Sequence, residues 1–382
     1  MNRTGRTAFA LIVCLLSARA AHSQLSYPYV TPFEQLAVTV RDDIVNINGI
    51  HSVGVDYATR KFYFDVFDVA WQPTLSAPGV IAYHPFLTPD VVDFTRAFFL
   101  RSWDQAIDDM DAGSPNPNGL RVYNFGGSSV VLEAYLPIGT EGSLKPYRIA
   151  VDFSDLTLLA SGIMMPTTIT NADIEARTDA LAERIDIQFN THAHLDHFSL
   201  SFTAAMDDRQ HPSVMPPGML ALGIQYGFAL PTMVAAATGV FPGMPMIDAY
   251  VYTGYQWNLD CNVYVFNFNV PVSGGPNDGI TFIHFGDNED VAGAGAFLNA
   301  LMSSGIIKNH VMTANCSNPQ AMAMSLVIPD VKFMTPTWEF SHFNGEGGWF
   351  GANCPTRQNL NPAVRLPLFP GESVHYPSDF PL

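Results

Sequence analysis

Residues 191–197 read Thr-His-Ala-His-Leu-Asp-His, and His192, His194, Asp196 and His197 place three imidazoles and a carboxylate close together. On an extended segment, side chains two residues apart point the same way, so His192 and His194 can hold one cation. Asp196 and His197 can turn toward a second cation beside it. Imidazole and carboxylate suit zinc, iron or manganese. Two ions roughly 3.5–4 Å apart can share a water and lower its pKa. The stretch predicts a metal site in which Asp196 orients the water or takes part in proton transfer.

The alternative for this stretch is a polar loop whose histidines are solvated or hydrogen-bonded, which is the ordinary role of a lone histidine. The residues before it favour metal binding. Residues 185–190, Ile-Asp-Ile-Gln-Phe-Asn, alternate apolar and polar side chains as a half-buried strand does. Four residues of ligand type directly after such a strand indicate a site at a strand end.

The segment His-Ala-His-Leu-Asp-His, residues 192–197, resembles the His-x-His-x-Asp-His signature of the metallo-β-lactamase fold superfamily. A weaker resemblance extends over about residues 119–345. The resemblance implies an α/β protein, a four-layer αββα sandwich with a metal site at one edge, and hydrolysis as the usual activity. The superfamily also contains lactonases, phosphodiesterases, sulfatases, thioester hydrolases and a few oxidoreductases, so the fold does not choose the substrate.

Further site residues follow from the resemblance. Gly286-Asp287 comes directly after an apolar strand pattern at 280–285, and it resembles the Gly-Asp element whose aspartate bridges two metals. Asp152 ends another strand pattern, where the superfamily often has a carboxylate that holds a ligand histidine by its spare N–H. A plain turn carboxylate is the alternative for Asp152. His284 lies on the opposite strand face from Asp287 and is expected to be second shell or structural.

Two positions depart from the superfamily pattern. The last ligand histidine is expected shortly after Pro336, where Trp338 stands, and His342 is the available substitute. Another histidine is expected between the main motif and Gly-Asp, and His211 is the only histidine between positions 198 and 283. His211 can equally be a surface residue. If neither His342 nor His211 binds, the site is mononuclear or the protein is non-catalytic.

Periodicity predicts the elements that position these residues. Strand patterns alternate with helical patterns after residue 171, which is typical of a layered α/β fold. We expect strands at 61–67, 121–134, 147–153, 185–190, 261–270, 280–285, 311–314 and 331–334, and helices from Pro89 through Phe98 and at 171–183, 291–304 and 319–326.

Residues 210–247 contain no Asp, Glu, Lys or Arg and hold five methionines. Prolines and glycines interrupt the stretch, which argues against a transmembrane helix. Buried helices and core loops are the expected structure, since apolar residues are most often core. The alternative is an apolar lid or pocket wall beside the metals, because methionine surfaces suit loosely specified apolar ligands.

The start of the chain resembles a secretory signal peptide. Arginines precede an apolar run at 8–16, and Ala21-His22-Ser23 is a plausible cleavage site. The run is too short for a permanent bilayer span. We therefore expect a signal peptide at 1–23, an N-terminal extension of unknown role at 24–118 and the metallohydrolase domain at 119–382. The protein would be secreted or periplasmic.

The net charge of the chain limits the kinds of partner that it can bind. The chain has 382 residues and a net charge of −17. Without residues 1–23, 15 Lys and Arg face 35 Asp and Glu, a net charge of −20. Such a chain repels nucleic acid and anionic membranes. An exported chain would keep Cys261, Cys316 and Cys354, which allows one disulfide whose pairing the sequence leaves open.

The hypothesis that combines these patterns is an exported metal-dependent hydrolase that carries one or two divalent ions, zinc first, with iron or manganese as alternatives. The charge-free stretch favours a small-molecule ester, lactone or thioester with an apolar part. The competing hypotheses are a non-catalytic binding protein with a degraded metal site, a phosphodiesterase, and an iron redox enzyme on the same fold.

Overall fold

The structure is a computed structural model. It describes residues 73–77, 80–83, 103–104, 106–113, 117–126, 129–138, 143–153, 171–194, 197–244, 246–313, 332–336, 365–368 and 373–377. The expected signal peptide, the strand at 61–67, the helix from Pro89 and the helix at 319–326 lie outside these residues.

Two seven-stranded sheets form the centre of the described structure. The first has the order β16-β3-β4-β5-β6-β7-β8. It pairs antiparallel from β16 to β5 and parallel from β5 to β8. Its strands are β3 (Leu120–Gly126), β4 (Ser129–Pro137), β5 (Leu144–Val151), β6 (Ile187–Phe189), β7 (Ser213–Met215), β8 (Met233–Ala235) and β16 (Ser373–Tyr376).

The second sheet has the order β15-β14-β13-β12-β11-β10-β9. Its long hairpin, β10 with β11, pairs antiparallel, as do β11 and β12, whereas β12 to β15 run parallel. The strands are β9 (Gly239–Phe241), β10 (Ile247–Gln256), β11 (Leu259–Phe268), β12 (Ile280–His284), β13 (His310–Thr313), β14 (Lys332–Pro336) and β15 (Arg365–Leu368).

The core lies between the two sheets. One cluster of buried side chains draws on both of them, from Val130 and Ile149 in the first to Phe266 and Phe282 in the second. Phe189 of β6 meets Phe266 edge to face, with ring centroids 4.9 Å apart. Alternating apolar residues on each strand supply these facing surfaces, so the two sheets bury one face against the other.

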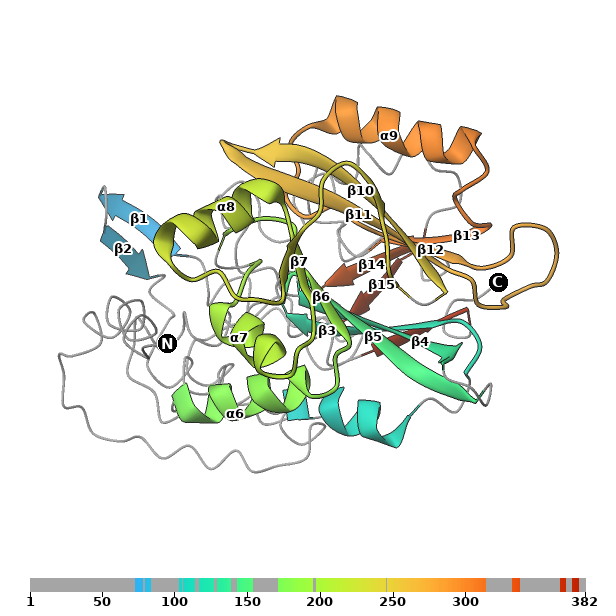
Figure 1. Ribbon diagram of the computed structural model, residues 1–382, viewed down its shortest axis with the longest axis horizontal. Coiled ribbons are helices and arrows are strands. Elements are labelled where there is room, and N and C mark those ends of the chain that lie inside the picture. The colour runs from blue at the N-terminus through green and yellow to red at the C-terminus, as the bar shows by residue number, and fades with distance from the viewer. Residues whose placement is uncertain are drawn as a thin grey trace, which may run out of the picture.

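Helices cover the outer faces (Figure 1). Helix α9 (Val291–Ser303) lies over the second sheet, and α6 (Asn171–Ala182) and α7 (Leu200–Asp208) lie over the first. Helix α8 (Pro217–Tyr226) packs near β8 and β11, at the side where both sheets end. The expected layered α/β class, with two facing sheets and helices outside them, is confirmed.

Part of the N-terminal extension also contacts this core. Residues 103–104 and 106–112 are helical, and the Trp103 indole N–H donates to the Phe125 carbonyl at 3.1 Å. The Trp103 ring packs on Phe125 and Phe153. Farther upstream, β1 (Pro73–Ala77) and β2 (Val80–Tyr83) form an antiparallel hairpin.

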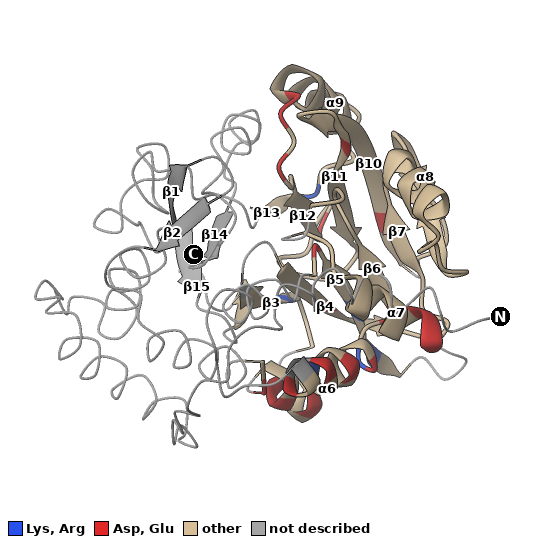
Figure 2. Ribbon diagram, turned by 90° about the vertical axis from the view of Figure 1, so that its left-hand side faces the viewer, with Lys and Arg blue, Asp and Glu red and all other residues tan. Residues whose placement is uncertain are grey.

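Two expectations need correction. The stretch 121–134 is not one strand, because β3 and β4 pair with each other as a hairpin around Gly126. The charge-free stretch is not mainly core: Ile224, Tyr226 and Val240 are 67%, 70% and 67% exposed. The reason is position, since β8 and β9 are the edge strands of their sheets and α8 lies beside them. Figure 2 shows α8 without a single charged residue.

No helix within the described residues is long and apolar enough to cross a membrane.

Candidate metal centre

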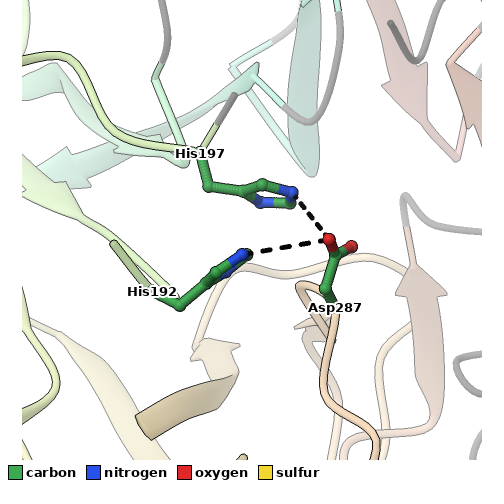
Figure 3. A group of neighbouring side chains, drawn as sticks. All are labelled: His192, His197 and Asp287. Carbon is green, nitrogen blue, oxygen red and sulfur yellow. Dashed lines mark ion pairs between the residues drawn. The ribbon is translucent and has the colours of Figure 1, made fainter. Parts of the chain in front are cut away.

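Three side chains from two loops of the chain point toward one another (Figure 3). His192, His197 and Asp287 are buried, and one ligand atom from each lies within 4.8 Å of the other two. Asp287 Oδ2 is 3.2 Å from His197 Nε2 and 3.9 Å from His192 Nε2. The two histidines follow β6 and the aspartate follows β12, so each sheet contributes to the cluster.

Strand direction explains this convergence. Strands β5 and β6 are parallel, so Asp152 and the histidine loop emerge at the same edge of the first sheet. Hydrogen bonds join that edge to the second sheet: Asn262 N donates to the Thr191 carbonyl at 2.8 Å, and the Tyr264 hydroxyl donates to the Asn190 carbonyl at 2.8 Å. These bonds fix the histidine loop beside β11.

Hydrogen bonds to Asp152 fix the conformation of the histidine loop. Its carboxylate accepts hydrogen bonds from Thr191 N at 2.6 Å, from Thr191 Oγ1 at 2.7 Å and from His197 Nδ1 at 2.7 Å. Burial by itself raises the pKa of Asp152, but the charge of His197 and its hydrogen bond outweigh burial and hold the pKa below the usual carboxyl value. Asp152 is therefore an ionised acceptor inside the fold.

These contacts determine which ring nitrogen of each histidine carries the proton. His197 Nδ1–H donates to Asp152, so the neutral form of this ring carries its lone pair on Nε2. The single hydroxyl proton of Thr191 already goes to Asp152, so His192 Nδ1 must donate to Thr191 Oγ1 across their 3.0 Å contact. His192 Nε2 is thereby unprotonated as well. Desolvation and the neighbouring His197 lower the pKa of His192 to about 3, so this imidazole is neutral near pH 7.

The cluster fits a divalent cation. The neutral His192 ring, His197 Nε2 and an aspartate oxygen face the same space, and a cation placed between them could bind all three. Two donors of a tetrahedral zinc ion lie about 3.3 Å apart. The 3.2 Å between His197 Nε2 and Asp287 Oδ2 is close to that separation. These donors are the type that zinc, iron and manganese share.

His194 adds a third nitrogen, and a fourth candidate ligand atom, at the exposed side of the cluster. Its Nδ1 lies 3.0 Å from His192 Nε2, and its ring is partly exposed. The Trp257 indole packs against this ring with centroids 5.1 Å apart, and Trp257 itself is 71% exposed. His192 and His194 can thus share one cation, and an exposed aromatic ring lies beside them.

The backbone conformation and the close neighbours of residue 286 require a glycine before Asp287. Its φ is +52°, and a Cβ at this position would lie 2.5 Å from Thr191 Oγ1. Any side chain there would push the Asp287 loop away from the histidine loop. Glycine is therefore required both by backbone conformation and by the close approach of the two loops.

His284 and Cys261 lie behind the cluster. His284 is buried, its Nδ1 is 3.6 Å from Asp152 Oδ2, and that nitrogen accepts a hydrogen bond from Gly286 N at 3.2 Å. Cys261 is a buried free thiol whose Sγ is 3.9 Å from His192 Nδ1, the nitrogen facing away from the cluster. Burial raises the pKa of the Cys261 thiol, which keeps it protonated and unsuited to ligation.

Three predicted site residues remain: Asp196, His342 and His211. Asp196 and His342 lie outside the described residues. His211 does not join the cluster, and its prediction as a ligand is wrong. It precedes β7, which runs parallel to β6, whereas the histidine loop follows β6. His211 is therefore at the opposite end of the sheet.

Sequence reasoning missed Thr191 and Gln256. Gln256 Nε2 donates to Asp287 Oδ2 at 2.8 Å, and Gln256 is buried. Thr191 adjoins the histidine motif and could have been found as a hydroxyl neighbour of a ligand. Gln256 had no such pattern, because its partner is reached only through the pairing of β10, β11 and β12.

No protein-family model matches the sequence, and no curated protein matches it. Among solved structures, the chain is similar to a putative metal-dependent hydrolase from Parabacteroides distasonis ATCC 8503, with 11% identity and a TM-score of 0.38, over 66% of this chain and 93% of that one. It is similar to metallo-β-lactamase SMB-1 with 10% identity and a TM-score of 0.29, over 52% and 80%. For TMB-1 the identity is 12% and the TM-score 0.29, over 51% and 88%.

Proposed function

We propose that this protein is an exported metal-dependent hydrolase that cleaves an ester, lactone or thioester with an apolar part. The carrying observation is the buried cluster of His192 Nε2, His197 Nε2 and Asp287 Oδ2, within 4.8 Å of one another. Export is proposed on the signal-peptide pattern of residues 1–23 alone.

His192, His194, His197 and Asp287 would hold one or two divalent ions, zinc first. Such an ion supplies a Lewis acid for a substrate oxygen and lowers the pKa of water. Asp152 holds His197 by Nδ1 and so keeps its Nε2 directed at the site. Asp196 is proposed to move the proton, and His342 to complete the ligand set. Both roles come from the sequence.

The apolar part of the substrate is proposed from exposed apolar side chains, one of which contacts the site. All but one of the large apolar side chains exposed in the described residues lie between 224 and 257. Trp257 is among them and packs directly against His194. An acyl chain whose carbonyl reaches the cluster would cross this indole, and burying its methylene groups would strengthen binding.

The test starts with metal analysis of purified protein from which residues 1–23 have been removed. A panel of nitrophenyl esters, a lactone, a thioester, bis-nitrophenyl phosphate and nitrocefin is then assayed with and without chelator. We expect bound zinc and chelator-sensitive hydrolysis of a carboxylic ester, lactone or thioester. His194 is partly exposed, so His194→Ala should abolish turnover without unfolding the protein, as circular dichroism would verify.

The double variant His192→Ala, His194→Ala is the stronger control for metal dependence. Unchanged activity in this variant would refute the mechanism. Zinc binding without turnover of any panel member would instead favour a binding protein, and turnover of the phosphodiester alone would move the proposal to that substrate class.

A further inference from the structure

Gln256 is held against the candidate metal centre by a set of contacts that the sequence motifs do not include. It is the last residue of β10, and only 7% of it is exposed. The residues on either side are bonded to the Asp287 loop: Glu289 N donates to the Tyr255 carbonyl at 2.8 Å, and Trp257 N donates to Glu289 Oε2 at 3.1 Å. The place of the Gln256 side chain is therefore fixed by its backbone neighbours.

The two ends of the Gln256 amide are in different situations. Nε2 donates to Asp287 Oδ2 at 2.8 Å. Oε1 is buried and has no hydrogen-bond partner within the described structure. A buried acceptor without a donor is unfavourable, and such a group indicates a missing ligand or water. Since Oε1 shares a carbon with Nε2, the unsatisfied acceptor lies beside the Asp287 carboxylate.

The chemistry of the site indicates what is missing. His192 Nε2, His197 Nε2 and Asp287 Oδ2 present lone pairs that one cation can satisfy together. The Gln256 oxygen is turned away from the bond that its own nitrogen makes to Asp287, so it needs a proton donor. A water molecule meets that need, because one hydrogen can bond to Oε1 while a lone pair stays free to attack.

We propose that Gln256 is a positioning residue for hydrolysis: its Nε2–H holds Asp287, and its Oε1 accepts one hydrogen of the attacking water. The water then faces the substrate carbonyl with a lone pair, forms the new C–O bond and gives one proton to a base. The acyl C–O or C–S bond breaks, and that proton passes to the leaving oxygen or sulfur, which gives a carboxylic acid and an alcohol or thiol. This proposal rests on the proposed function. Gln256 also lies in the chain interval where the superfamily resemblance leads us to expect another histidine, and His211 does not fill that role.

The experiment compares Gln256→Met, which removes both amide ends at similar volume, with Gln256→Glu, which keeps an acceptor and removes the donor. Asn299→Leu on the exposed surface of α9, which replaces an amide by an apolar side chain of similar volume, is the matched control. Each protein is loaded with zinc and assayed on the best ester of the panel. Zinc dissociation constants come from competition with a chromophoric chelator, and cobalt(II)-loaded samples report ligand geometry by their visible absorption.

For Gln256→Met we expect kcat to fall about 100-fold, as loss of orientation does, while KM stays within about threefold. The zinc dissociation constant should rise about tenfold because Asp287 loses its hydrogen-bond donor, and the cobalt(II) bands should shift. Gln256→Glu should keep more of kcat than Gln256→Met, since its oxygen can still accept from the water. Asn299→Leu should match the unaltered protein in every measurement.

Three results would overturn the proposal. If Gln256→Met keeps the kcat and the zinc affinity of the unaltered protein, this amide neither positions the water nor holds Asp287. A KM raised about 100-fold at constant kcat would show that the amide binds substrate instead of water. If the unaltered protein binds zinc but hydrolyses nothing, the proposed function fails and the water role fails with it. The zinc affinity and cobalt(II) spectrum of Gln256→Met then still decide whether this amide holds Asp287.

Discussion

The Asp152 carboxylate accepts the Nδ1 proton of His197 at 2.7 Å, and the opposite ring nitrogen, Nε2, lies 3.2 Å from Asp287 Oδ2. The same carboxylate accepts both the backbone and the hydroxyl proton of Thr191. One buried anion therefore sets the orientation of His197 directly and that of His192 through Thr191. The backbone φ of Asp152 is +50°, a value that aspartate tolerates better than most residues.

Replacing Asp152 by asparagine should weaken metal binding roughly 10–100-fold. The amide keeps the shape and suits the positive φ, but its NH₂ cannot accept all three donors. An NH₂ facing His197 Nδ1 favours the wrong tautomer and puts a proton on Nε2. Chelator competition would measure the effect, with Asp278→Asn in an exposed turn as the control. Equal zinc affinity in both variants would contradict this role of Asp152.

Gly286→Ala should lower the free energy of unfolding by more than Gly305→Ala. Both residues have positive φ, +52° and +67°, so each alanine costs about 1–2 kcal/mol for backbone conformation. Only at Gly286 does the added methyl group meet Thr191, whereas nothing lies within 4 Å of it at Gly305. Overpacking adds roughly 1–3 kcal/mol. Urea denaturation would compare them, and equal losses would show that the two loops are not tightly packed.

Zinc added to the metal-free protein should raise its melting temperature. At 100 times the dissociation constant, a ligand that binds only the folded state adds about 2.7 kcal/mol. For a chain of this size the shift is roughly 3–4 °C. Chelator should reverse it, and His194→Ala should reduce it. A melting temperature that does not depend on zinc would argue against a metal site formed by these residues.

Trp257→Ala should raise KM for nitrophenyl esters of long acyl chains and leave the acetate ester nearly unaffected. Each methylene group that loses contact with the indole removes up to about 0.8 kcal/mol of binding. The measurement is KM against chain length. Leu144→Ala is the control, because that exposed side chain begins β5 in the other sheet. Parallel chain-length dependence in Trp257→Ala and the unaltered protein would exclude the indole from substrate binding.

Cys261 should resist alkylation by iodoacetamide in the native protein. Its side chain is fully buried, and burial raises the pKa of the thiol, so little thiolate is available. Peptide mapping by mass spectrometry would follow modification of this residue with and without urea. Labelling at equal rates in both conditions would show that the interior next to His192 opens readily.

Local patterns were enough to predict most of the described fold. Period-2 alternation predicted β6, and apolar runs bounded by turns predicted β11 and β12, because those signals lie within each strand. The layered α/β class followed from the alternation of such strands with helices. The motif at 192–197 and Gly286-Asp287 could be predicted as site residues for a similar reason, because each directly follows a strand.

The rest depended on contacts between distant residues. Composition suggested that the charge-free stretch was core, but Ile224 and Val240 are exposed because their elements border the open sides of the sheets. Gln256 carries no motif, and only the register of β10 on β11 and of β11 on β12 brings it to Asp287. His211 was a candidate only by residue type, and strand direction removes it.

The histidines and Asp287 come from opposite halves of the sandwich, so these ligand atoms lie close together only after the halves have docked. During synthesis, the chain must extend beyond residue 287 before any of these atoms can close around a cation together. A metal ion would therefore bind late in folding, and once bound it would slow the separation of the two sheets.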